Sequence, residues 1–153
     1  NLLYAWRNDD WRLVDCGDAI EPSGYGVGAV VGDWNGDGRL ELMLGHGETV
    51  PAEMSLYAAK PNRNHWLRVE PVTAAGAPAR GAVVRLRCGR VMTRVIDCGS
   101  GYLSQSEPVA HFGLGLSNSV DWLEVVWPDG ASVRIPEPEI RQTLRVAHPN
   151  QTL

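Results

Sequence analysis

Glycine and proline interrupt this chain so often that its apolar segments are all short. The sequence has 17 glycines and 10 prolines among 153 residues, and they lie between the apolar runs instead of forming one tract. Turn-forming residues at such short intervals are typical of proteins built from many short strands. No segment longer than about eleven residues repeats apolar side chains at the helical spacing. The sequence therefore predicts an all-β protein.

The predicted strands form two groups. The first group covers residues 2–6, 11–14, 27–31, 40–44 and a strand that begins at Leu56. The second group covers residues 66–69, 82–87, 91–96, 109–112, 120–127, 131–135 and 143–146. Strands at this spacing suggest a compact antiparallel β-sandwich or barrel for the second group. We expect two units, residues 1–60 and 62–147, followed by a tail at residues 148–153.

A weak internal repeat indicates the architecture of the first unit. The pair Leu3-Tyr4 recurs as Leu56-Tyr57, 53 residues later, and both pairs are followed by a loop. Four strands at a period of about 50 residues match the length of one β-propeller blade. We therefore expect residues 1–60 to form a blade-like unit of a partial propeller. A single blade exposes sheet faces that neighbouring blades normally bury.

The net charge of −4 is concentrated in the first part of the chain. Residues 1–60 contain ten acidic and four basic side chains, whereas residues 61–153 contain eight acidic and ten basic ones. This distribution argues against nucleic acid as a partner and favours cations. No run approaches the roughly 18 apolar residues of a membrane-spanning helix. No leader peptide can be read at Asn1, so we expect a segment of a longer protein.

The three cysteines, Cys16, Cys88 and Cys98, are an odd number and do not form a closed disulfide framework. A hairpin predicted at Gly89-Arg90, with Cys88 opposite Val91, places Cys88 and Cys98 too far apart for a disulfide. We expect all three to be reduced and to behave as small apolar residues. A zinc site is not indicated, because no Cys-x-x-Cys spacing occurs.

One loop carries the strongest chemical signal in the sequence. Oxygen-bearing side chains fall at positions 1, 3, 5 and 9 of the segment 33–41, which are Asp33, Asn35, Asp37 and Glu41. Alternate residues on a tightly curled loop point toward its inner side, and calcium takes six to eight oxygen ligands. The main-chain carbonyl of Arg39 would complete the set. The segment therefore predicts a calcium site between two strands.

The loop admits three other interpretations. An EF-hand is excluded, because that loop needs a bidentate Glu at position 12, where this chain has Leu44 inside an apolar strand. A metal-free polar turn is an alternative, because Asn-Gly and Asp-Gly are common turn dipeptides. Magnesium suits the loop less well than calcium, because it retains water and requires strict octahedral geometry.

The same residues resemble known families. The segment 32–42 is similar to the FG-GAP repeat of integrin α-chain propellers and their bacterial relatives. Four later segments resemble the ASPIC/UnbV domain, namely residues 64–69, 99–105, 111–115 and 125–130. Both patterns in this order resemble the C-terminal part of the cartilage acidic protein family. The resemblance covers residues 1–147.

The resemblance implies a secreted or surface-exposed calcium-binding propeller protein with a β-rich cap domain. Carried over by position, the calcium ligands are Asp33, Asn35, Asp37, the Arg39 carbonyl and Glu41, where Glu41 stands at a position often occupied by Asp. Vertebrate members add an EGF-like module and are associated with extracellular matrix and with antagonism of a neuronal receptor. This chain has no EGF cysteines. The implied partner is an extracellular protein or glycan, and the cap domain has no defined catalytic residues to carry over.

The sequence contains no recognisable enzyme motif, and we expect a non-enzymatic function. Asp97, Ser100 and His111 lie close in sequence, but Ser100 reads as part of a Gly-Ser-Gly turn and His111 as a strand residue. His46 and Glu48 flank Gly47, which gives too few ligands for a metal site.

A carbohydrate-binding or polysaccharide-acting protein is the alternative function. Trp66, Trp122 and Trp127 could form a platform on which sugar rings stack, although tryptophans in strands are more often buried. A polysaccharide hydrolase or lyase would require a cleft with two convergent carboxylates. None of the acidic residues in the second part lies in an enzyme-like motif.

Overall fold

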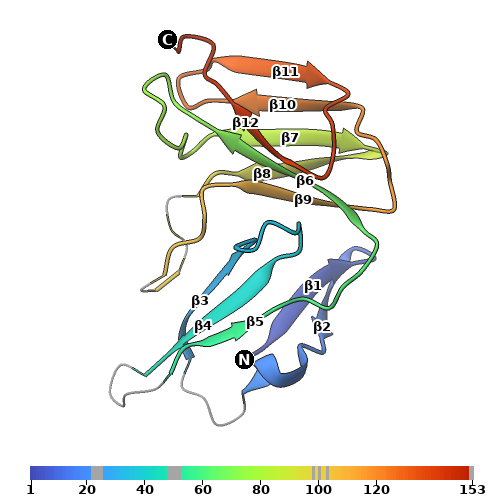
Figure 1. The fold of residues 1–153 in the computed structure, drawn as a ribbon, viewed down its shortest axis with the longest axis vertical. Helices are drawn as coiled ribbons and strands as arrows, with labels where there is room; N and C mark the ends of the chain where they lie inside the picture. Colours follow the sequence, from blue (N-terminus) through green and yellow to red (C-terminus); the bar gives the residue numbers. More distant parts are fainter. Residues whose placement is uncertain (22–25, 48–52, 98, 100, 103, 152–153) are drawn as a thin grey trace.

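The computed structural model describes residues 1–21, 26–47, 53–97, 99, 101–102 and 104–151. The predicted all-β class is confirmed, and the helical content of the described residues is a single 3₁₀ turn, η1 (Gly17–Ile20). No helix in this part of the chain has the length and apolarity needed to cross a membrane. The strands β1 to β5 lie at one end of the molecule, and β6 to β12 lie at the other (Figure 1).

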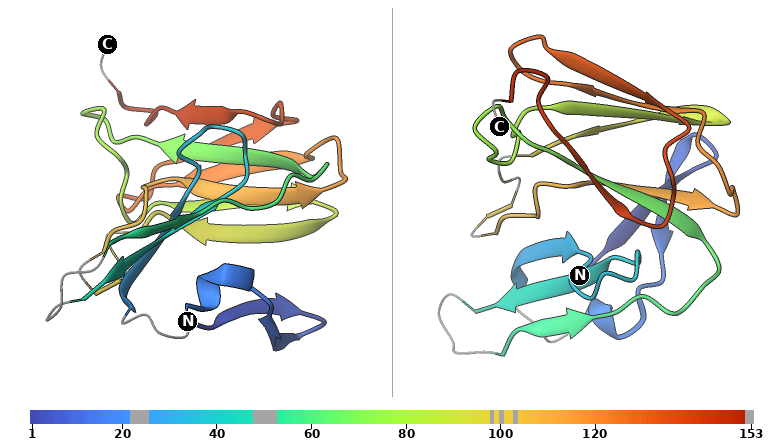
Figure 2. Two further views of the ribbon diagram at one scale, coloured as in Figure 1. Left: turned by 60° about the horizontal axis from the view of Figure 1, so that its bottom comes forward. Right: turned by 45° about the horizontal axis from the view of Figure 1, so that its top comes forward.

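The first part of the chain forms two small antiparallel sheets. Strands β1 (Leu3–Arg7) and β2 (Asp10–Val14) make a hairpin. Strands β3 (Gly26–Gly32), β4 (Glu41–His46) and β5 (Ser55–Tyr57) make a three-stranded sheet in the order β3-β4-β5. Within the described residues this differs from the single four-stranded blade that was predicted. Both sheets lie on the same side of the larger second part (Figures 1 and 2).

The second part is a sandwich of two sheets, with strand orders β11-β10-β7-β8 and β12-β6-β9. The two sheets remain separate, so the barrel alternative is not realised. The strands match the predicted positions and are bounded as follows: β6 (His65–Pro71), β7 (Val83–Cys88), β8 (Arg90–Val95), β9 (Ala110–Gly115), β10 (Trp122–Val126), β11 (Ser132–Pro136) and β12 (Thr143–Val146).

The core lies between these two sheets and follows from alternation along the strands. Leu67 and Val69 of β6 point inward and are fully buried, as is Phe112 of β9. Leu123 and Val125 of β10 meet them from the opposite sheet. Because successive side chains of a strand point to opposite faces, the residues between them face outward. This outward face of β6 and β9 positions the candidate site.

One strand pair differs from the predicted antiparallel arrangement. Strand β12 runs parallel to β6, with Thr143 opposite Arg68 and Val146 opposite Pro71. The chain leaves β11 in one sheet and crosses to the other sheet before β12 begins. A strand that arrives by such a crossover is free to run in either direction, unlike one joined by a tight hairpin.

The hairpin β7–β8 is confirmed, but its predicted register is wrong by one residue. Cys88 lies opposite Arg90 and not Val91, because Gly89 alone connects the two strands and Arg90 already belongs to β8. Cys16 and Cys88 are free cysteines. Cys98 lies outside the described residues, so its expected reduced state is not tested.

Candidate metal-binding site

The loop between β3 and β4 curls around its own polar side chains. Asn35 Oδ1 accepts a hydrogen bond from the Asp37 backbone N–H at 2.9 Å, and Asp37 Oδ1 accepts one from the Arg39 N–H at 2.8 Å. Asp33 Oδ2 accepts a hydrogen bond from the N–H of Gly38, five residues later, at 3.0 Å. The alternate residues predicted from the sequence are therefore the ones whose oxygens the curl turns toward the main chain.

Two glycines allow this curl. Gly36 and Gly38 have φ values of 73° and 82°, in the left-handed region that side chains disfavour. The two positions differ in their surroundings. A Cβ at Gly36 would meet no atom within 4 Å, whereas a Cβ at Gly38 would lie 1.9–2.2 Å from atoms of the Trp66 indole ring. The loop therefore packs closely on strand β6 at Gly38.

The predicted carboxylates differ in their partners. Glu41 is 5% exposed and accepts a hydrogen bond from the Trp34 N–H at 2.9 Å. Asp37 forms an ion pair with the Arg39 side chain. Asp33 is 4% exposed, and its Oδ1 atom accepts no hydrogen bond from any described residue. An unpartnered carboxylate oxygen in a buried position is costly, so Asp33 is the residue of the loop that most needs a further cation.

The fit to a metal ion is incomplete in one respect. Among the residues that the structure describes, no three His, Cys, Asp or Glu side chains converge closely enough to hold a metal. The buried Oδ1 atom of Asp33 and the curled loop suit an oxygen-liganded ion. The Asp37 carboxylate, however, is occupied by Arg39 and by the Asn35 amide at 3.0 Å. Binding would require Asp37 to exchange these contacts for the ion.

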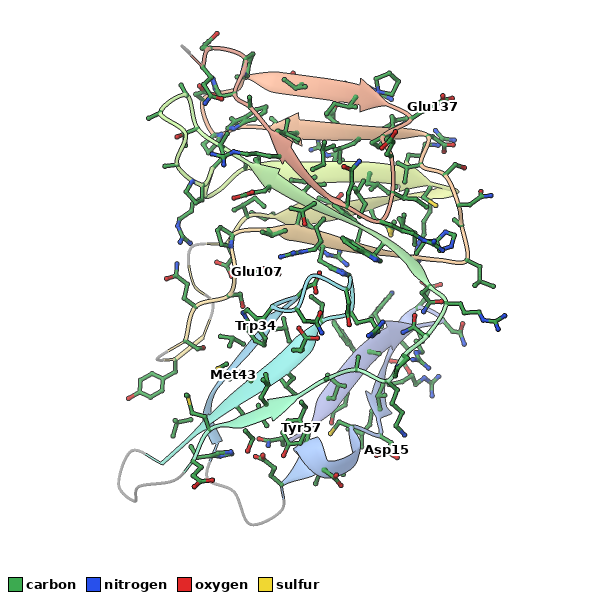
Figure 3. The ribbon with its side chains drawn as sticks, in the orientation of Figure 1. Asp15, Trp34, Met43, Tyr57, Glu107 and Glu137 are labelled. Carbon is green, nitrogen blue, oxygen red and sulfur yellow. The ribbon has the colours of Figure 1, made fainter. Side chains whose placement is uncertain are left out.

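The sandwich supplies a cation to the loop. Arg68 projects from the outward face of β6 and is 9% exposed. Its Nη1 atom lies 3.4 Å from Asp33 Oδ2, and its Nη2 atom pairs with Glu107. Glu107 also accepts a hydrogen bond from the Asp33 N–H at 3.3 Å. Figure 3 shows Glu107 and Trp34 on facing sides of this junction. The two halves of the chain are therefore joined by buried charges as well as by packing.

His111 makes the second polar contact across the junction. It lies opposite Arg68 on the neighbouring strand β9 and donates a hydrogen bond from Nε2 to the Gly38 carbonyl at 3.0 Å. Burial lowers the pKa of His111, and the adjacent Arg68 guanidinium lowers it further, while the bond to Gly38 acts in the opposite direction. The folded structure therefore favours the neutral imidazole.

This lowered pKa predicts a pH dependence of stability. An unfolded histidine takes up a proton near pH 6.5, before the folded one does, so His111 lowers the free energy of unfolding as pH falls through that value. In His111→Gln, which keeps an N–H donor but does not titrate, we expect a shallower decline between pH 7.5 and 5.5. Urea unfolding of His111→Gln and of the unsubstituted chain in EDTA across this range measures the difference. An unchanged slope in His111→Gln would contradict the assignment.

Sequence reasoning missed Trp66, Arg68, Glu107 and His111 as parts of this site. The available signal was Arg68, a charged residue placed between the apolar residues Leu67 and Val69. Such a residue normally faces solvent, and the sequence did not indicate that a loop from the first half covers it. The surface of β6 and β9 on which the loop packs depends on contacts between residues up to 74 positions apart, which local patterns do not encode.

The other histidines and acidic residues singled out from the sequence lie apart from the loop or outside the described residues, except for His111. His111 contacts Gly38, while Ser100, its suggested triad partner, lies outside the described residues. Glu48 also lies outside them. His46 contacts Glu21 Oε2 at 3.0 Å and Ser55 Oγ at 3.2 Å.

The suggested tryptophan platform does not form. Trp127 is buried, and its indole N–H donates to the Val72 carbonyl at 2.9 Å. Trp122 carries the Arg134 guanidinium over its ring at 4.1 Å from the centroid. Trp66 packs against Gly38. The three rings therefore serve separate structural contacts.

The second half of the chain matches a known protein family. The sequence pattern described as ASPIC and UnbV matches residues 72–153, which is more than half of the chain. The chain belongs to the ASPIC and UnbV family.

The curated relatives include vertebrate proteins. Cartilage acidic protein 1 of Xenopus tropicalis is 47% identical over 140 residues, which are 88% of this chain and 22% of that protein. Cartilage acidic protein 1 of Homo sapiens is 46% identical over 138 residues, which are 87% of this chain and 21% of that protein. The chain thus spans about a fifth of the length of these relatives.

Proposed function

We propose that this chain is a non-enzymatic, calcium-binding interaction module of an extracellular protein. The ion would be held by Asp33, Asn35, Asp37, Glu41 and the Arg39 carbonyl. It would neutralise the carboxylates of the loop and hold the loop closed against the sandwich. The observation that carries the proposal is the buried Oδ1 atom of Asp33, which has no hydrogen-bond partner among the described residues.

The chemistry of the loop favours calcium over other ions. All proposed ligands are oxygens, which suits a hard cation, and no described cysteine or histidine lies among them. Their side chains vary in length, and calcium tolerates irregular coordination better than magnesium does. The ten carboxylates in residues 1–60 also favour a cation over an anionic partner. Calcium bound here would fix the position of the first half on the sandwich.

We further propose that residues 1–60 belong to a β-propeller in a secreted protein. The antiparallel order β3-β4-β5 is compatible with part of a blade. The hairpin β1–β2 exposes Trp6 and Trp11, whose rings meet edge to face at 5.4 Å, and these large apolar surfaces are suited to contact with a neighbouring blade. The similarity to cartilage acidic protein 1 supports an extracellular setting, because the name of that protein refers to cartilage.

Calcium is expected to stabilise the chain measurably. Extracellular calcium modules bind with dissociation constants of about 10⁻⁴–10⁻³ M. At 10 mM calcium this affinity predicts a stabilisation of about 1.4–2.7 kcal/mol. Thermal melting and calorimetric titration measure it, and magnesium at the same concentration should have a smaller effect.

A pair of matched variants localises the effect. Asp37→Asn keeps the side-chain oxygen that accepts the Arg39 N–H, but it removes a ligand charge, so calcium should no longer stabilise the chain. Asp129→Asn is the control, because Asp129 Oδ1 accepts the Ala131 N–H at 3.0 Å in the same kind of turn outside the loop. No melting shift at 10 mM calcium, or an equal shift in Asp37→Asn, would refute the proposal.

A further inference from the structure

A polar hollow of about 610 Å³ lies beside the candidate metal loop. Its walls come from both halves of the chain. The loop contributes Asp37 and Arg39, and the segment that leads into β6 contributes Arg63, His65 and Trp66. Arg141, in the segment before β12, also lines the hollow. Three arginines and one carboxylate therefore line the hollow, in a chain whose overall charge is negative.

Arg141 is held in place from two directions. Its backbone has a φ of 61°, an unfavourable conformation for a residue with a side chain, and its N–H donates to the Trp66 carbonyl at 2.7 Å. Its Nη2 atom donates to His65 Nε2 at 2.5 Å. The opposite ring nitrogen of His65, Nδ1, donates to the Ser117 carbonyl at 2.8 Å. This hydrogen bond fixes the His65 tautomer that can accept from Arg141.

The arrangement leaves guanidinium groups available for a ligand. Arg63 is exposed, and neither it nor Arg141 forms an ion pair with a carboxylate of the described residues. A planar guanidinium donates two parallel hydrogen bonds to an oxyanion, which gives both affinity and orientation. The hollow therefore has the charge and the donor geometry of an anion site.

We propose that this hollow binds a sulfated glycan. The inference builds on the proposed interaction function by naming the class of partner. The amides of Asn62 and Asn64 line the same hollow and can bond sugar hydroxyls, and Trp66 provides an aromatic wall. Among the described residues that line it, Leu116 is the only aliphatic one. An acidic peptide with apolar anchors is therefore a poorer match.

The calcium loop and the hollow share two residues, which couples them. Asp37 now neutralises Arg39 through an ion pair. A calcium ion that took Asp37 as a ligand would leave the Arg39 guanidinium free to contact the glycan. Calcium should therefore strengthen glycan binding.

Calorimetric titration with a heparin-derived tetrasaccharide tests the proposal, in 5 mM calcium and separately in EDTA. The double variant Arg63→Gln/Arg141→Gln should weaken binding about tenfold or more, because it removes two charge-assisted contacts. Arg87→Gln/Arg90→Gln removes the same charge from the β7–β8 hairpin and should change binding less than about threefold. Arg63→Gln alone, at an exposed position, provides a second test if the double variant is unstable.

The outcomes separate this proposal from the calcium proposal. Binding that requires Arg63 and Arg141 supports the glycan site. An affinity that calcium does not raise overturns the coupling between the glycan site and the calcium loop, but not the glycan site itself. A calcium-dependent melting shift without tetrasaccharide binding overturns the glycan site and leaves the calcium proposal in place. Equal loss of binding in the two double variants overturns the glycan site, since it indicates a general charge effect. Tighter binding of an octaglutamate peptide than of the tetrasaccharide overturns it in favour of an acidic peptide.

Discussion

Gly38→Ala is expected to destabilise this chain far more than Gly36→Ala. Both glycines have positive φ, so an alanine at either position carries a backbone cost of about 1–2 kcal/mol. Only at Gly38 does the new Cβ also overlap a neighbour, because it would lie 1.9–2.2 Å from the Trp66 ring. Overpacking of this kind costs a further 1–3 kcal/mol or so. We therefore expect about 2–5 kcal/mol for Gly38→Ala.

Urea unfolding of the two variants in EDTA measures the difference. Gly36→Ala is the matched control, because its Cβ would meet no atom within 4 Å and so reports the backbone cost alone. Replacing Trp66 with leucine in the Gly38→Ala background should recover part of the lost stability, since the clash involves the indole ring. Equal destabilisation by the two alanines would show that the loop does not pack on strand β6.

Arg68→Met is the second variant with a large expected effect. Arg68 is nearly buried and lies between the Asp33 and Glu107 carboxylates. Methionine preserves much of the side-chain volume but leaves both carboxylates without their cation. Removal of one partner from a buried ion pair costs about 3–5 kcal/mol, mainly because the remaining charge is buried and unpaired. Chemical denaturation in EDTA should reveal a loss of this size.

Two comparisons identify the cause of that loss. Arg85→Met removes the exposed partner of Glu124, and both residues lie in the sheet that does not contain Arg68. This substitution should cost less than about 1 kcal/mol. The double variant Arg68→Met/Asp33→Asn should be more stable than Arg68→Met, because the unpaired charge on Asp33 is gone. If the second substitution adds to the loss instead, the pair does not interact as described.

The sequence predicted the local structure well, because strand formation depends on patterns within a few residues. The alternation of apolar and polar residues placed the strands. The spacing of Asp33, Asn35 and Asp37 identified a loop whose curl is held by hydrogen bonds from its main chain to these side chains. The direction of β12 and the register of the β7–β8 hairpin were wrong. The first depends on a crossover between sheets. The second depends on whether one residue or two form a turn.

The docking of the loop on the sandwich could not be read from the sequence. Arg68 lies in a strand and His111 in another, and only the pairing of β6 with β9 brings them side by side. Glu107 precedes β9, and no sequence motif around it indicates a contact with the loop. Whether a charged residue on a strand faces water or a second structural unit depends on tertiary contacts. No local signal distinguishes these two cases.

The parallel pairing of β12 with β6 has a consequence for biosynthesis. Thr143, which meets Arg68 in that pair, follows it by 75 residues. At about 5–20 residues per second, the ribosome needs roughly 4–15 seconds to make the connecting segment. During this interval β6 lacks one of its two neighbours in the sheet. The sheet that carries Arg68 and His111 is therefore completed after all the other strands of the sandwich have been made.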